Sequence, residues 1–186
     1  EEFENNYKKV GYFTFNKFLK EETLKLYNKY KNRENKEIHF YTVNDFCLQQ
    51  LKKEENFFCG YRKFLKWYKD ERINNSKLLK NIDANAIWSE IRGIIKGSML
   101  EDWIRSLDLS SNIIDFNFYK ELSYKYSDFN EMEREELYNL TIEYNKWLKK
   151  NNLYDDNDLA FEVLTNIQTS EFVKFDFIVC DEVQDL

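Results

Sequence analysis

A short apolar run that delivers two adjacent carboxylates constrains this chain more than any other feature. Residues 177–180 read Phe-Ile-Val-Cys, and Asp181 and Glu182 follow directly. Such a run is typical of a buried strand, and a carboxylate at the C-terminal tip of a strand can hold Mg²⁺ beside a nucleotide phosphate. In this arrangement Asp181 would bind the metal and Glu182 would accept the proton of an attacking water. A strand end that is charged only because it meets solvent is the alternative.

Gln184 and Asp185 extend the same motif after Val183, which returns to the core. Their side chains would contact phosphate, water or a neighbouring element. The sequence stops at Leu186, directly after the motif, so we expect a piece of a larger protein.

The composition favours a globular, intracellular protein of the cytoplasm or nucleus. The 186 residues are 42% hydrophobic, which is sufficient for a core. No stretch reaches the 18 or so apolar residues of a membrane span, and the first residues lack the layout of a signal peptide. Cys47, Cys59 and Cys180 have no CxxC spacing, so we expect free thiols. His39 is expected to be packed or at a strand edge.

Basic residues are concentrated in one part of a chain whose net charge is −6. Residues 57–100 contain nine Lys or Arg against four Asp or Glu, a local balance of +5. Lys63, Lys66 and Lys69 recur at helical spacing and could face phosphate, although a solvated helix face explains the same pattern.

Two strand-to-helix units open the chain. Residues 10–15 are β-prone and end at Asn16, whose side chain can cap a helix that reaches Tyr30. Residues 38–43 form a second strand candidate, with Asn44 as the cap of the next helix. Parallel strands need helical crossovers, so these units predict part of a parallel α/β sheet.

Helical periodicity replaces strand signals for roughly a hundred residues after Asn56. Asp83 is predicted to cap one helix, which Gly97 would end in a left-handed conformation. The four tryptophans lie on apolar helical stripes, which indicates a core role. Further helices are predicted over 100–107, 131–150 and 159–168, and residues 115–126 are expected to form one or two short helices.

The expected fold is therefore predominantly α-helical with a minor α/β part. Residues 1–56 and 169–186 would form pieces of one parallel sheet, with the last strand beside the first two. Residues 57–168 would form a helical insertion between them.

The string Asp181-Glu182-Val183-Gln184-Asp185-Leu186 resembles the Walker B element (motif II) of UvrD/Rep-type superfamily 1 helicases. Residues 13–16 resemble motif Ia, and residues 40–46 resemble the next strand-end motif of the same domain. The resemblance implies a RecA-like sheet of the P-loop NTPase fold, called 1A, with a helical subdomain 1B inserted. Residues 87–98 and 154–159 are similar to a UvrD-like branch that includes large eukaryotic proteins with tetratricopeptide and ankyrin repeats.

The resemblance also implies roles for residues. Asp181 would ligate the Mg²⁺ of bound ATP, Glu182 would be the catalytic base, and Gln184, with Asp185 beside it, would couple nucleotide state to DNA movement. The nucleic-acid contacts would come from Thr14, Phe15, Asn16, Thr42 and Asn44, with Phe15 stacking on a base. Many family members have His where this chain has Asn44, which weakens the assignment of those contacts.

The phosphate-binding loop G-x-x-x-x-G-K-[ST] is absent, because the four glycines are Gly11, Gly60, Gly93 and Gly97. We therefore expect a parent protein that couples ATP hydrolysis to translocation on single-stranded nucleic acid, with DNA favoured over RNA and no membrane contact. The isolated chain should be inactive and hold no cofactor tightly. The alternative is a helicase-derived scaffold with a degenerate motor, whose helical region binds proteins.

Overall fold

The computed structural model describes residues 9–31, 37–72, 78–97, 112–166 and 172–181. The chain divides into two compact units. We call residues 1–53 together with 166–186 the sheet unit, and residues 54–165 the helical unit. The assignment of the helical unit to a 1B subdomain stays a prediction.

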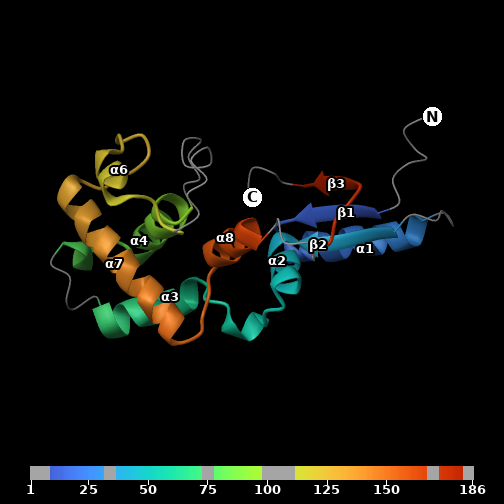
Figure 1. Ribbon diagram of the computed structural model, residues 1–186, viewed down its shortest axis with the longest axis horizontal. Helices are drawn as coiled ribbons and strands as arrows, with labels where there is room; N and C mark the ends of the chain where they lie inside the picture. Colours follow the sequence, from blue (N-terminus) through green and yellow to red (C-terminus); the bar gives the residue numbers. More distant parts are fainter. Residues whose placement is uncertain (1–8, 32–36, 73–77, 98–111, 167–171, 182–186) are drawn as a thin grey trace. The chain divides into compact units, whose positions relative to one another are not determined.

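The sheet unit contains three parallel strands in the order β2-β1-β3 (Figure 1). The strands are β1 (Lys9–Thr14), β2 (Glu37–Thr42) and β3 (Phe177–Cys180). Thr14 lies opposite Thr42, and Phe13 lies opposite Cys180, so all three strands end at one edge of the sheet. The predicted parallel pairing and the return of the last strand beside the first are confirmed.

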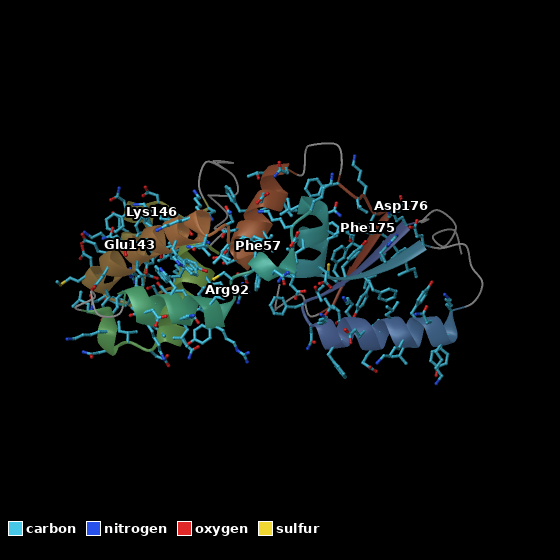
Figure 2. All side chains as sticks on the ribbon, turned by 90° about the horizontal axis from the view of Figure 1, so that it is seen from below. Phe57, Arg92, Glu143, Lys146, Phe175 and Asp176 are labelled. Atoms are coloured by element: carbon cyan, nitrogen blue, oxygen red, sulfur yellow. The ribbon has the colours of Figure 1, made fainter. Side chains whose placement is uncertain are left out.

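Two helices pack on opposite faces of this sheet (Figure 2). Helix α1 (Lys17–Tyr30) begins at the predicted cap, where Asn16 Oδ1 accepts a hydrogen bond from the Phe18 amide at 2.9 Å. Its Tyr27 ring lies 5.4 Å from the ring of Phe40 on β2. On the other face, Phe46 of α2 (Val43–Leu51) packs edge-on against Phe13, with the ring centroids 5.1 Å apart.

The cap of α2 is Thr42, and the prediction that Asn44 caps this helix is wrong. Thr42 Oγ1 accepts a hydrogen bond from the Asp45 amide at 3.0 Å. The backbone of Thr42 is extended, so its hydroxyl reaches the third residue beyond it. Asn44 lies inside the first helical turn as a consequence.

Strand β3 is not buried, contrary to the expectation from its apolar sequence. Phe177, Ile178 and Val179 are 48%, 53% and 39% exposed. Among the described residues β3 pairs only with β1, and α1 and α2 pack over β1 and β2. An apolar run indicates that a segment can pack in a core. It does not indicate whether the described residues include the elements that would cover it.

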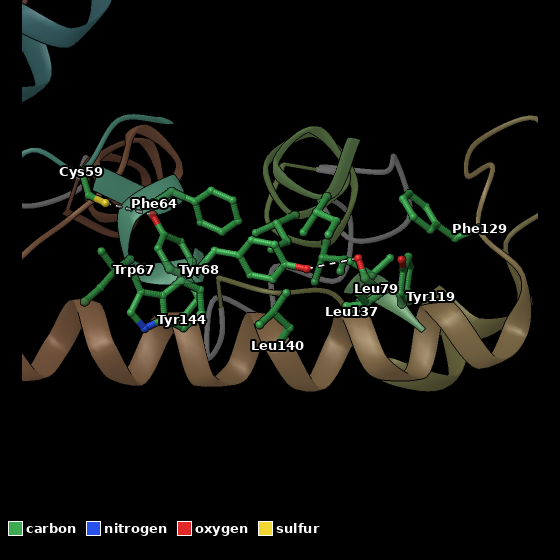
Figure 3. Packing of buried hydrophobic residues seen from close by; sticks show 14 of the residues in the cluster. Cys59, Phe64, Trp67, Tyr68, Leu79, Tyr119, Phe129, Leu137, Leu140 and Tyr144 are labelled. Atoms are coloured by element: carbon green, nitrogen blue, oxygen red, sulfur yellow. Dashed lines mark hydrogen bonds between the residues drawn. The ribbon is translucent and has the colours of Figure 1, made fainter. Parts of the chain in front are cut away.

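The helical unit is organised around α7 (Glu131–Lys150), whose predicted bounds are confirmed. Asn130 and Glu133 form a capping box at its start. Figure 3 shows the buried cluster along one side of α7, where Leu137, Tyr144 and Leu148 are almost fully buried.

The helical unit also contains shorter helices. They are η1 (Glu55–Phe57), α3 (Tyr61–Trp67), which continues as the π-helical η2 (Tyr68–Arg72), η4 (Leu79–Asn81), α4 (Ala84–Glu90), which continues as the π-helical η5 (Ile91–Ile95), α6 (Phe116–Glu121) and α8 (Asp156–Asn166). Asp83 caps α4 as predicted, and the helix predicted over 100–107 lies outside the described residues.

Aromatic rings fill much of this core. Trp67 is 2% exposed, and Trp88 and Trp147 pack against the same cluster, which confirms their predicted core role. Trp103 lies outside the described residues. Tyr144 donates a hydrogen bond to the buried Cys59 thiol at 3.4 Å, and burial raises the pKa of Cys59 to about 11.

Gly97 is not in the left-handed conformation that the sequence predicts, since no described glycine has positive φ. The helix ends in a wider turn instead, in which the Lys96 amide donates to the Ile91 carbonyl at 2.8 Å. This turn brings Gly97 so near the Arg92 carbonyl that a Cβ would lie 2.2 Å from its oxygen. Glycine is required by this close approach.

The ends of the helical unit meet. The Cys59 amide donates to the Tyr154 carbonyl at 2.7 Å, and the Tyr154 amide donates to the Phe57 carbonyl at 3.2 Å. This isolated parallel bridge between Phe58 and Tyr154 joins the segment that enters the unit to the one that leaves it.

Ion pairs join the end of η5 to the start of α8. Lys96 Nζ contacts Asp155 Oδ2 at 2.6 Å and Asp158 Oδ1 at 2.9 Å, and Arg92 pairs with Asp156. Burial raises the pKa of Asp155 to about 6, although the Lys96 ammonium opposes this. Asp155 Oδ1 also accepts from the Asp158 amide at 2.9 Å, so α8 begins three residues before the predicted Leu159.

Candidate nucleotide and nucleic-acid site

Asp181 lies directly after β3, at the edge of the sheet where the parallel strands end. Its amide donates to the Phe13 carbonyl at 2.8 Å, which extends the pairing with β1 by one step. Its carboxylate Oδ2 accepts a hydrogen bond from Tyr12 Oη at 2.7 Å. The residue is half-buried. These two hydrogen bonds orient its carboxylate relative to β1.

Tyr12 is a site residue that sequence reasoning missed. Side chains alternate along a strand, so Tyr12 and Thr14 lie on the same face of β1. This is the face covered by α1, where Tyr12 Oη also lies 3.5 Å from Thr23 Oγ1. No signal in the sequence marks Tyr12, because its contact with Asp181 depends on which strand pairs with β3.

Glu182, Gln184 and Asp185 lie outside the described residues. Their roles as catalytic base and nucleotide-coupling groups stay predictions.

The two threonines proposed to lie near nucleic acid are buried at the strand ends. Thr14 is 0% exposed and its Oγ1 accepts from the Asn16 amide at 3.3 Å. Thr42 is 5% exposed and its hydroxyl caps α2. The structure therefore assigns both hydroxyls a local structural role.

The other predicted contacts at this edge differ in exposure. Phe15 is 52% exposed, which leaves its ring accessible for stacking. Asn16 is exposed but its side chain is engaged in capping α1. Asn44 is half-buried in the first turn of α2. Their contacts with nucleic acid stay predictions.

The three candidate lysines of the helical unit are not equivalent. Lys63 Nζ donates to the carbonyls of Asn56 and Phe58 at 2.8 and 2.7 Å, so it holds the segment before α3. Lys66 and Lys69 are exposed. Of the three lysines, Lys66 and Lys69 are therefore the better candidates for a contact with phosphate.

The Asp181 carboxylate can be compared with the known forms of Mg²⁺ binding. Mg²⁺ prefers oxygen ligands, keeps several waters, and is commonly held by one or two carboxylates together with substrate phosphates. No group of three or more His, Cys, Asp or Glu that could hold a metal occurs among the described residues. Mg²⁺ binding by Asp181 stays a prediction, and a metal that accompanies a nucleotide is the form that the prediction takes.

A comparison with known protein families settles the membership of the chain. The family model described as the UvrD/REP helicase N-terminal domain matches residues 4–186. The chain belongs to this family. The predicted UvrD/Rep relationship is confirmed, and the three-stranded parallel sheet beside a mostly helical region is consistent with part of a P-loop NTPase domain of the UvrD/REP type.

A comparison of the chain with curated proteins and a comparison with solved structures found no match. The placement of the chain in the tetratricopeptide and ankyrin-repeat branch stays a prediction. The two stretches that carry that resemblance, 87–98 and 154–159, are in contact through the Lys96 and Arg92 ion pairs. In the part of the chain that the structure describes, no helix is long and apolar enough to cross a membrane.

Proposed function

We propose that this chain forms part of an ATP-dependent superfamily 1 motor that moves on single-stranded nucleic acid, with DNA as the favoured track. The family match over residues 4–186 carries this proposal. The position of Asp181 supports it, because ligands of open parallel α/β sheets bind outside the carboxyl ends of the strands.

In this proposal Asp181 binds Mg²⁺ that accompanies ATP, and Tyr12 orients its carboxylate through the 2.7 Å hydrogen bond. The metal, when bound, supplies charge neutralisation at the phosphates. Glu182 accepts the proton of the attacking water, and Gln184 and Asp185 link the nucleotide site to movement. We propose the cytoplasm or nucleus as the location of the chain, because a motor of this kind acts where nucleic acid is present.

We also propose that the 186 residues do not hydrolyse ATP by themselves, because they contain no phosphate-binding loop. ATPase assays of the purified chain should show no turnover above background. Turnover that Glu182→Gln abolishes would contradict this part of the proposal and leave the family membership intact.

The role of Asp181 is tested in a protein that contains this chain and hydrolyses ATP. Asp181→Asn should remove Mg²⁺-dependent hydrolysis. Asp176→Asn is the matched control, because Asp176 lies at the opposite end of β3 and its carboxylate accepts from the Lys9 amide at 2.8 Å. Equal activity of the two variants would sink the assignment of Asp181.

Nucleic-acid binding by the helical unit is tested with a fluorescent single-stranded oligonucleotide and anisotropy. Reversal of Lys66 and Lys69 to Glu should weaken binding and flatten its salt dependence. Reversal of Lys149 and Lys150, which are exposed at the end of α7, is the matched control. If the unmodified chain does not bind at low salt, a helicase-derived module that binds proteins becomes the better description.

A further inference from the structure

The helical unit contains a pocket of about 350 Å³ that the proposed motor function does not use. One wall comes from α4 and η5 and the other from the segment between α6 and α7. The lining residues are Ala86, Ser89, Glu90, Ile94, Lys125, Tyr126, Ser127, Asp128 and Phe129. We call this cavity the Glu90 pocket.

Glu90 is a buried acid in the wall of this pocket. Its residue is 6% exposed, and its Oε1 accepts a hydrogen bond from Tyr119 Oη at 2.8 Å. Burial raises the pKa of Glu90 above its ordinary value, and the hydrogen bonds from Ser127 and Tyr119 offset only part of this effect. A carboxylate held in this way gains stability from a cation that enters the pocket.

Arg134 is the neighbouring cation of the protein itself, and its guanidinium is engaged elsewhere. Arg134 is 4% exposed and donates to the carbonyls of Lys120 and Ser127, each at 3.1 Å, and to the carbonyl of Leu122. These contacts fix the loop that forms the second wall. The charge of Arg134 favours the ionised form of Glu90, which still lines the pocket.

The stretch of chain that includes the second wall has an excess of acidic residues. Residues 115–136 contain seven Asp or Glu and three Lys or Arg, and one of the three is the buried Arg134. Asp128 is exposed at the pocket wall, and Tyr126, also in the lining, is 57% exposed. A phosphate backbone would be repelled here, whereas a cation would be attracted and could stack on the tyrosine ring.

We propose that the Glu90 pocket binds an arginine side chain presented by a partner protein. The guanidinium is planar, stacks on aromatic rings and donates in pairs to a carboxylate, so it matches Glu90, Asp128 and Tyr126 together. The pocket belongs to the helical unit and Asp181 to the sheet unit, and this proposal does not depend on the motor proposal.

The test is a titration of the isotopically labelled 186-residue chain with N-acetyl-arginine amide, followed by amide NMR shifts. Shifts should concentrate at residues 89, 90 and 125–129. The citrulline analogue has nearly the same shape without the charge, and it should bind at least about tenfold more weakly, as expected for loss of a charged partner. Equal binding of the two probes, or no binding of the arginine probe, would overturn the proposal.

Exposed variants locate the binding without disturbing the core. Asp128→Lys should weaken binding about fivefold or more, the size expected for a lost close charge pair. Asp70→Lys makes the same change at an exposed site outside the pocket and should leave the affinity nearly unchanged. Ser89→Trp, at an exposed position of the lining, should block entry. Equal losses in the two Asp variants would mean that only the general field attracts the probe.

Lys125 distinguishes a cationic ligand from an anionic one. Lys125→Gln should strengthen binding of the arginine probe, because it removes a like charge from the lining. If a single-stranded oligonucleotide shifts the same resonances and loses affinity in Lys125→Gln, the pocket is a nucleotide site and the arginine proposal fails. Glu90→Gln should abolish arginine binding with the rest of the spectrum preserved, and unchanged binding in a folded variant would also overturn it.

Discussion

At Gly97 the main chain passes so close to itself that no other residue fits without displacement. A Cβ there would lie 2.2 Å from the Arg92 carbonyl oxygen and 3.1 Å from Asn157 Nδ2. Gly93, four residues earlier, differs completely, because nothing would lie within 4 Å of its Cβ. The two glycines of one helix end therefore have different physical reasons for their presence.

Gly97→Ala should destabilise the helical unit by about 1–3 kcal/mol, as overpacking against a fixed atom does. Gly93→Ala should be neutral or stabilising by up to about 1 kcal/mol, because alanine costs less backbone entropy than glycine in a helix. Urea unfolding followed by tryptophan fluorescence measures both. Gly97→Asn separates the explanations: asparagine is tolerated in a left-handed cap, but here it should cost at least as much as alanine. A loss of stability that is smaller for Gly97→Asn than for Gly97→Ala would favour the left-handed cap as the explanation.

Asp181 shows how much of a single residue's environment could be predicted from the sequence. The apolar run before it predicted a strand tip, and the structure has it at the carboxyl edge of a parallel sheet. Its bond from Tyr12 could not be predicted in the same way, because it joins residues 169 positions apart and depends on which strand pairs with β3. Pairing partners are not encoded in the alternation of one strand.

Among the elements, those with a long period or a strong cap were predictable and the junctions were not. Helix α7 has a sustained apolar stripe and a capping box, so its bounds followed from residues 130–150. The end of η5 and the start of α8 depended on the Lys96 contacts with Asp155 and Asp158, which join distant segments. Tertiary contacts of this kind override local preference within a turn of a helix end.

The junction between β2 and α2 gives a direct comparison of two candidate caps. Thr42→Val keeps the volume of a side chain that is 5% exposed and removes the hydroxyl that accepts from the Asp45 amide. It should cost about 1 kcal/mol. Asn44→Ala should change stability by less than about 0.5 kcal/mol, because Asn44 lies within the helix and alanine has the better helix propensity. Urea unfolding followed by far-UV circular dichroism measures both, and a larger loss for Asn44→Ala would contradict the assigned cap.

For the molecule as a whole, the two units have separate cores of different character. The sheet unit packs aromatic rings such as Phe13, Phe46 and Phe175 around three strands. The helical unit buries a continuous cluster along α7. The sequence predicted both classes of structure, since strand and helix periods differ. It did not predict the exposure of β3, because that depends on which layers the chain itself provides.

Separate cores predict that the units unfold in separate transitions. All four tryptophans lie within residues 54–165, so tryptophan fluorescence reports the helical unit, whereas far-UV circular dichroism reports both. Leu137→Ala removes a fully buried side chain of α7 and should shift the fluorescence midpoint by an amount equivalent to about 2–5 kcal/mol.

Phe13→Leu, in the sheet unit, should lower the unfolding midpoint of only one part of the dichroism change. This is the part that tryptophan fluorescence does not follow. Phe13 is 8% exposed and its ring contacts Tyr41, Phe46 and Phe175, so the smaller side chain loses packing there and nowhere in the helical unit. If Phe13→Leu moves the fluorescence midpoint as far as the dichroism midpoint, the chain unfolds as one cooperative body. In that case the two cores stabilise each other, and substitutions in either unit would have to be interpreted as changes to the stability of both.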